Sequence, residues 1–306
     1  MSPSPAKRKR TEEAPIKHSE FWLRDGSVVL QAQNTQFRVH FSVLARHSPV
    51  FRDMEELPQP SDGPSVDGCP VVCLPDESND VEYLLKALYD PTFHSQQKLP
   101  LAVVGALIRL GRKYEFRDLL HSAAARVTGE YPTTLAAYDA MSTFKTIEDY
   151  DGIDFDMVTL LSENNILSSL PLAYYCAVQM TPIETFLDRA CFSQVDLRRC
   201  VIGQKRLFLK QFQPGYTFGW ARKWDFHDNC TSPVVCRISR EDFLAVYMED
   251  CDILALAEPK CLRAFKFCAP CTRHATASIA AGRKKIWDEL PQMFDLPPWD
   301  QLKNDL

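Results

Sequence analysis

The cysteines near the C-terminus are the residues of this sequence with the clearest chemical potential. Cys268-Ala-Pro-Cys271 places two thiols three positions apart, and Cys230 and Cys236 precede them along the chain. Two pairs of thiolates at short spacing suit Zn²⁺, because each pair can chelate one side of a tetrahedral ion. These four cysteines are therefore candidate ligands of a structural zinc ion.

These cysteines could instead be separate buried thiols. Only the second pair has tight spacing, and the region is rich in tryptophan and phenylalanine, which could enclose each thiol by itself. A redox role for the C-x₂-C pair would need a thioredoxin-like strand and helix around it, which the sequence does not show. No phosphate-binding loop, dinucleotide fingerprint or serine-nucleophile elbow is visible either. We therefore expect no catalytic residues, no cofactor besides zinc and no enzymatic activity.

A second chemically suggestive run is basic and lies in the N-terminal tail. Residues 1–18 are polar, contain serine and proline and lack periodicity, which predicts a disordered tail. Within it, Lys7, Arg8, Lys9 and Arg10 form a cluster that a nuclear import receptor could recognise. The simpler alternative is a solvated basic patch. The expected location is accordingly the nucleus, the cytoplasm or both.

The composition is that of a soluble, folded protein. The chain has 306 residues, of which 45% are hydrophobic and 25% charged, so one large domain or two ordinary ones can form a core. A net charge of −5 argues against direct nucleic-acid binding. Without a long apolar run or a secretory signal, we expect no membrane contact and reduced thiols.

The elements that must position these residues follow from the hydrophobic period. Strand-like alternation over residues 27–41, with a turn at Asn34-Thr35, predicts a hairpin, and residues 42–56 predict two short helices. Residues 59–68 are expected to be an exposed loop and residues 71–74 a buried strand.

Helices are expected over most of the remaining chain. Asn79 and Glu82 form a capping-box pattern at the start of the next helix, and Gly111 predicts a close contact between helices. Residues 131–212 read as a helical extension and residues 213–306 as a Cys- and Trp-rich C-terminal region. The apolar residues from Trp287 to Trp299 are expected to close onto this region, or alternatively to bind a partner as a hook.

Three segments resemble the BTB/POZ domain family. They are FRVHFSVLARHSPVF, VVCLPDESNDVEYLLKALYD and LIRLGRKYEFRDLL, and the resemblance covers residues 19–130. The start DGSVVL and the Cys- and Trp-bearing C-terminal region further resemble the BTB-domain proteins that filamentous and mushroom-forming fungi carry in many copies. The resemblance implies an α+β fold, a small mixed sheet capped by helices, and a role in binding other proteins. His40, where strand gives way to helix, is expected to be a buried structural residue.

The resemblance also implies particular contact residues. A dimer interface would involve the first strand and first helices, here Phe21, Trp22, Leu23, Val43 and Val50. The alternative is that these residues pack on their own domain.

Met54 and Glu56 resemble the short motif by which adaptor BTB domains contact a cullin. The alternative is an ordinary solvated helix end, in which the same residue types are common. The expected function is therefore self-association and partner recruitment, as a cullin ubiquitin-ligase adaptor or, alternatively, as a nuclear regulatory scaffold that dimerises without a cullin.

Overall fold

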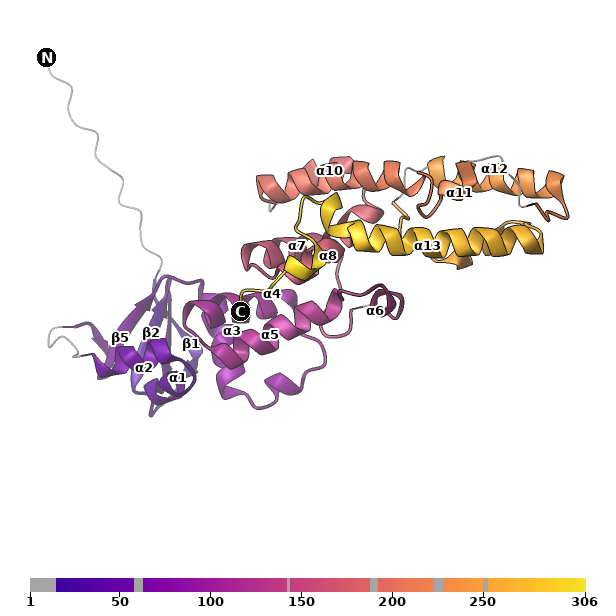
Figure 1. Cartoon of the computed structure of the whole chain (residues 1–306). Helices are drawn as coiled ribbons and strands as arrows, with labels where there is room; N and C mark the ends of the chain where they lie inside the picture. Colours follow the sequence, from indigo (N-terminus) through magenta and orange to yellow (C-terminus); the bar gives the residue numbers. More distant parts are fainter. Residues whose placement is uncertain (1–14, 58–62, 142–143, 188–191, 223–227, 250–252) are drawn as a thin grey trace, which may run out of the picture. The chain divides into compact units, whose positions relative to one another are not determined.

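The computed structural model describes residues 15–57, 63–141, 144–187, 192–222, 228–249 and 253–306 (Figure 1). The basic cluster from Lys7 to Arg10 lies outside the described residues. The chain forms two compact units, Met1–Ala123 and Ala124–Leu306. The expected helical extension and the expected Cys- and Trp-rich region both belong to the second unit.

The first unit contains a five-stranded mixed sheet with the order β1-β3-β2-β5-β4. Its strands are β1 (Lys17–Trp22), β2 (Val28–Ala32), β3 (Thr35–Val39), β4 (Ser65–Val66) and β5 (Cys69–Leu74). β2 runs antiparallel to β3 and parallel to β5, and β1 runs parallel to β3. Val28, Val29 and Leu30 are all fully buried, as expected for a central strand covered on both faces.

The turns of the sheet differ from expectation in two places. Ala32 pairs with Thr35, so Gln33 and Asn34 form the hairpin turn, and Gln33 adopts a φ of 52°. Part of the expected loop 59–68 instead forms β4, which pairs with β5. The connecting Asp67 and Gly68 have φ values of 48° and 77°, the conformation that a tight two-residue hairpin requires.

The helices of the first unit follow the predicted order. They are α1 (Phe41–His47), α2 (Pro49–Glu56), α3 (Ser78–Tyr89), η1 (Phe93–Ser95), α4 (Leu101–Lys113) and α5 (Arg117–Glu130), the last of which crosses into the second unit. A Cβ at Gly111 would lie 3.0 Å from the Cβ of Leu120, which confirms the close helix contact. The capping-box prediction is wrong, because α3 begins before Asn79 and the amide of Ser78 donates to the Gln33 side chain at 3.3 Å.

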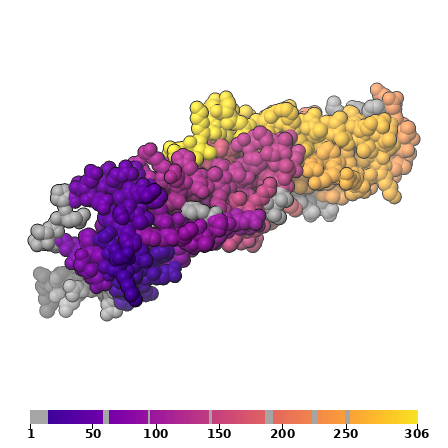
Figure 2. Space-filling view, turned by 90° about the horizontal axis from the view of Figure 1, so that it is seen from below, coloured from indigo at the N-terminus to yellow at the C-terminus, as the bar shows by residue number. Residues whose placement is uncertain are grey.

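The described part of the second unit is helical. Its elements are α6 (Leu135–Asp139), α7 (Ile153–Glu163), η2 (Leu167–Ser169), α8 (Leu170–Gln179), α9 (Ile183–Leu187), α10 (Gln194–Gln211), α11 (Gly219–Arg222), α12 (Pro233–Glu249), η3 (Pro259–Ala264), α13 (Ala269–Met293) and η4 (Trp299–Gln301). α13 runs beside α10 and beside the α11–α12 segment (Figure 1). On the face shown in Figure 2, the orange atoms of the α11–α12 segment lie next to the yellow atoms of α13.

The end of the chain folds back onto this unit. Leu290 and Phe294 are fully buried, and the ring of Trp299 stacks on that of Trp287 with centroids 5.4 Å apart. The indole N–H of Trp299 also donates to the carbonyl of Trp287 at 2.8 Å. The segment closes onto the second unit, but its apolar side chains pack mainly on residues 131–212, since Trp287 lies 5.7 Å from the ring of Tyr138 and Phe294 stacks on Tyr174 at 5.1 Å. The α+β class with a helical C-terminal part is confirmed. None of the described helices has the length and apolarity needed to cross a bilayer.

Candidate functional site

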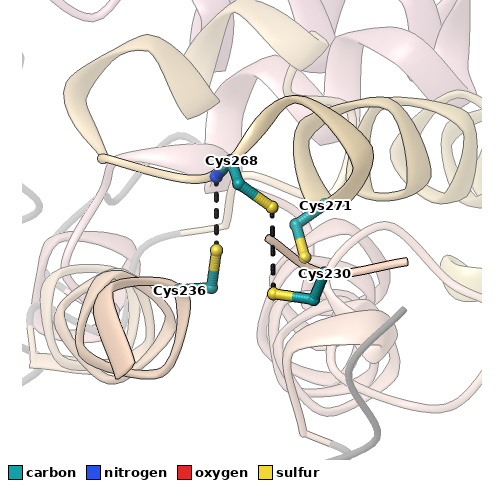
Figure 3. Close-up of side chains that lie close together, drawn as sticks. All are labelled: Cys230, Cys236, Cys268 and Cys271. Carbon is teal, nitrogen blue, oxygen red and sulfur yellow. Dashed lines mark hydrogen bonds between the residues drawn. The ribbon is translucent and has the colours of Figure 1, made fainter. Parts of the chain in front are cut away.

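Four cysteines gather at one place in the second unit. The sulfur atoms of Cys230, Cys236, Cys268 and Cys271 all lie within 4.8 Å of one another (Figure 3). The Sγ atoms of Cys230 and Cys268 are 3.8 Å apart, well beyond the length of a disulfide bond, and all four cysteines are free. The structure thus brings together the four cysteines whose spacing suggested a common site.

Two helix starts position these sulfurs. Pro233 opens α12, which places Cys236 in the first turn and leaves Cys230 in the preceding loop. Cys268 is the N-cap residue of α13, and Cys271 lies in its first turn. The backbone N–H of Cys268 donates to the sulfur of Cys236 at 3.2 Å (Figure 3). The chelating pair is therefore a consequence of local helix geometry, whereas the meeting of the two pairs is a tertiary contact.

The electrostatics of the cluster favour charge on one sulfur. Burial disfavours the thiolate of Cys268, but the backbone N–H groups of Cys271 and Thr231 outweigh it and lower the pKa of Cys268 to about 5. Burial, together with the neighbouring thiols, raises the pKa of Cys236 and of Cys271. Adjacent thiolates repel one another, so one anion among thiols is the arrangement that suits a cluster without a cation.

The geometry fits a metal ion. With metal–sulfur bonds of about 2.3 Å, the sulfurs of a tetrahedral site are separated by about 3.8 Å. The separation of 3.8 Å between Cys230 and Cys268 matches this distance. The four clustered cysteines could therefore bind a metal ion, with every tetrahedral position taken by protein sulfur. His274, three residues after Cys271, is exposed and is not a member of the cluster.

The surfaces of the first unit carry the predicted contact residues. The side chains expected at a dimer interface are all half-buried: Phe21, Trp22, Leu23, Val43 and Val50. Trp22 stacks on His18 with ring centroids 3.8 Å apart, and Phe21 lies 6.3 Å from the ring of Tyr89. These side chains thus pack partly on their own unit and leave part of their surface accessible. β1, which carries two of them, is an edge strand of the described sheet.

The last turn of α2 carries the residues of the cullin-like step. Met54 is half-buried and Glu56 is exposed. Leu57, the next residue, is 63% exposed.

His40 differs from expectation in its burial and in its partners, since it was expected to be buried. Its imidazole is half-buried, and its Nε2 lies 3.2 Å from a carboxylate oxygen of Asp25. The hydrogen bond from His40 is the main cause of the lowered pKa of Asp25. Tyr89 accepts a hydrogen bond from the backbone N–H of His40 at 2.9 Å. His40 is therefore structural, but through side chains that sequence reasoning did not connect to it.

Comparison with known proteins identifies part of the chain. Residues 24–128 match the BTB/POZ domain family model, over about a third of the chain. No curated protein and no solved structure matches the chain. The matched range contains all three segments that resemble the family, together with the strands β2 to β5 and the helices α1 to α4. Residues 24–128 are therefore a BTB/POZ domain, a module of protein–protein interaction.

Proposed function

We propose that this chain is a non-enzymatic interaction protein that self-associates through its BTB/POZ domain and recruits other proteins. The supporting observation is the edge strand β1, with half-buried apolar side chains on it and on the first turns of α1 and α2. Incompletely buried apolar side chains beside an unpaired strand edge favour association with a second chain. Kinship with the fungal BTB proteins is part of the same proposal and rests on the start DGSVVL and on the Cys- and Trp-rich C-terminal region.

The self-association can be tested with a Val43→Asp, Val50→Asp double variant. Both positions lie in the first turn of a helix, where an acidic residue is tolerated, so the fold should survive. Sedimentation velocity should show a dimer for the wild type and a monomer for the variant. Leu57→Asp is the matched control, since Leu57 is exposed but lies outside the proposed interface. A monomeric wild type at micromolar concentration would refute self-association.

A second candidate function is that of an adaptor for a cullin ubiquitin ligase. It is favoured by the accessible Met54 and Glu56 at the end of α2, because an apolar side chain beside a carboxylate can serve as anchor and rim. Cullin recovered from native cells with the wild type should be lost with Met54→Ala, Glu56→Ala. The control Asp53→Ala, Glu55→Ala changes two exposed acids of the same helix and should retain it. If no cullin is recovered with the wild type, the adaptor function is refuted and the scaffold function described next is favoured.

That alternative is a nuclear regulatory scaffold that dimerises without a cullin. It is supported by the basic run from Lys7 to Arg10. Replacing all four residues by alanine should move a fluorescently tagged chain from the nucleus to the cytoplasm. An unchanged distribution would remove the basis for nuclear import.

We also propose that the four clustered cysteines hold one structural Zn²⁺ ion. The donors are four sulfurs within 4.8 Å of one another, the separation of Cys230 and Cys268 matches that of a tetrahedral site, and four sulfur ligands would leave no coordination position for a substrate, all of which suit structural zinc. Elemental analysis of the purified full-length chain should find one zinc per chain. Less than about one tenth of that amount, in protein purified without chelators, would refute the zinc site.

A further inference from the structure

Helix α12 exposes several of its apolar side chains and buries two polar ones. Its exposed side chains include five large apolar residues, each at least 44% exposed: Val234, Val235, Ile238, Val246 and Met248. Its buried side chains are Cys236, Ser239, Arg240 and Phe243, at positions i, i+3, i+4 and i+7 of a single face. An amphipathic helix ordinarily buries its valines and isoleucines and exposes its serine and arginine.

The inward face of α12 is anchored differently at its two ends. In the C-terminal half, Phe243 packs against the rings of Trp220, Phe265 and Phe218, with centroids 5.1, 5.2 and 5.3 Å away. In the N-terminal half the contacts are polar. Ser239 accepts a hydrogen bond from the backbone N–H of Lys266 at 3.1 Å, and Arg240 donates to the carbonyl of Ala221 at 2.7 Å.

Apolar burial therefore does not explain why the first half of α12 lies as it does. The net contribution of such hydrogen bonds is modest, because water would otherwise satisfy the same groups, although the charged guanidinium of Arg240 makes the stronger of the two. Full burial of a valine or isoleucine is a larger source of stability than a neutral hydrogen bond, and this half leaves Val234, Val235 and Ile238 exposed. The one remaining buried side chain among the described residues of this half is Cys236, whose thiol belongs to the four-cysteine cluster.

We propose that a metal ion bound by the four cysteines holds the N-terminal half of α12 against the start of α13, in an orientation that its apolar residues alone would not select. This inference rests on the proposed zinc site. Bonds to Cys236 from one helix and to Cys268 and Cys271 from the other join two helix starts that are more than 30 positions apart in the sequence. Because the metal binds the folded site, its binding free energy becomes folding free energy of this region.

Hydrogen exchange on the full-length chain tests the inference. Backbone exchange in residues 233–241 is compared among the zinc-loaded chain, the chelator-treated chain and the treated chain after zinc is added back. We expect exchange to accelerate by roughly 100-fold or more without metal and to slow again with added zinc. Without the metal bonds, local opening of this segment costs less free energy. Exchange in α4 of the first unit should not change, which excludes a general effect of the chelator.

Two variants separate the metal from the individual thiols. Cys230→Ser removes a ligand that lies outside any helix, and it should give the fast exchange of the metal-free chain even with zinc added. Cys261→Ser changes a half-buried thiol of the same unit outside the cluster, and it should behave as wild type. If the Cys230 variant does not fold, the comparison of zinc-loaded, chelator-treated and zinc-restored wild type still tests the inference.

The outcomes distinguish this inference from the zinc proposal beneath it. A chain that contains one zinc but keeps slow exchange in α12 after the metal is removed would overturn the inference and leave the zinc site standing. A purified wild type without zinc, whose exchange in α12 is slow and unaffected by added zinc, would overturn both.

Discussion

At the scale of single residues, an added methyl group should change stability in opposite directions at two glycines. Gly282 lies on α13 where a Cβ would collide with the backbone of Tyr216 and Thr217, whereas a Cβ at Gly129 in α5 would meet nothing within 4 Å. Gly282→Ala should lower the free energy of unfolding by about 2–4 kcal/mol, because backbone rather than a flexible side chain must move. Gly129→Ala should raise it by up to about 1 kcal/mol by restricting the unfolded chain. Urea titrations of both variants measure this, and effects of the same sign would contradict it.

Asp154 allows a pH prediction at the same scale. Burial raises the pKa of this carboxyl above the ordinary value of 3.8, although the Tyr131 hydroxyl donates to it at 2.8 Å and opposes the shift. A carboxyl whose folded pKa lies above its unfolded pKa contributes stability below the unfolded pKa and loses it as pH rises through the folded pKa. Asp154→Asn keeps an acceptor for Tyr131 and removes the charge. The variant should be more stable than wild type at pH 7, with a difference that shrinks toward pH 4, and a constant difference across this range would refute the assignment.

At the scale of elements, helix ends depend on partners that are distant in sequence. Ser48 is fully buried between α1 and α2, accepts a hydrogen bond from the N–H of Phe51 at 3.1 Å and donates to the carbonyl of Tyr114. The cap of α6 has the same chemistry in solvent, since exposed Thr134 accepts from Ala137 at 3.3 Å. Burial therefore distinguishes two caps that look alike in sequence.

This difference predicts unequal costs for the same loss of a hydroxyl. Ser48→Ala should cost about 2–3 kcal/mol, because it leaves a buried N–H and a buried carbonyl without this partner. Thr134→Ala should cost about 1 kcal/mol or less, because water can take the place of the hydroxyl. Chemical denaturation of each variant gives the two values, and equal costs would show that the burial of Ser48 is not what matters.

At the scale of the whole molecule, two compact units predict two unfolding steps. Trp22 is the single tryptophan before Ala123, and the other four lie in the second unit's part of the sequence. Fluorescence of the wild type should therefore follow both units, and that of Trp22→Phe should follow the second unit alone. Ser48→Ala should shift only the first transition and Gly282→Ala only the second. A single coincident transition in all variants would show that the units unfold together.

Much of this organisation could be predicted from the sequence because it depends on local patterns. The hairpin and the helices α1 and α2 follow from a change of hydrophobic period near Phe41. Cys268 and Cys271 fall on one helix start because three positions make about one helical turn. The strand β4 was also encoded locally, in Asp67-Gly68, and was missed because the loop-like composition around it outweighed that hairpin signal.

Other features were decided only by the tertiary structure. The Gln33 side chain caps α3 from a turn 45 positions away, and the two cysteine pairs meet across 38 positions. α12 buries Cys236 and Arg240 and exposes Val234 and Ile238, the reverse of what hydrophobicity predicts for an isolated helix. Sequence determines which groups need a partner, because that follows from residue type and local geometry. Which partner each group finds depends on long-range packing: the inward face of α12 carries Phe243, which lies among aromatic rings, and Cys236, which lies among three other cysteine sulfurs.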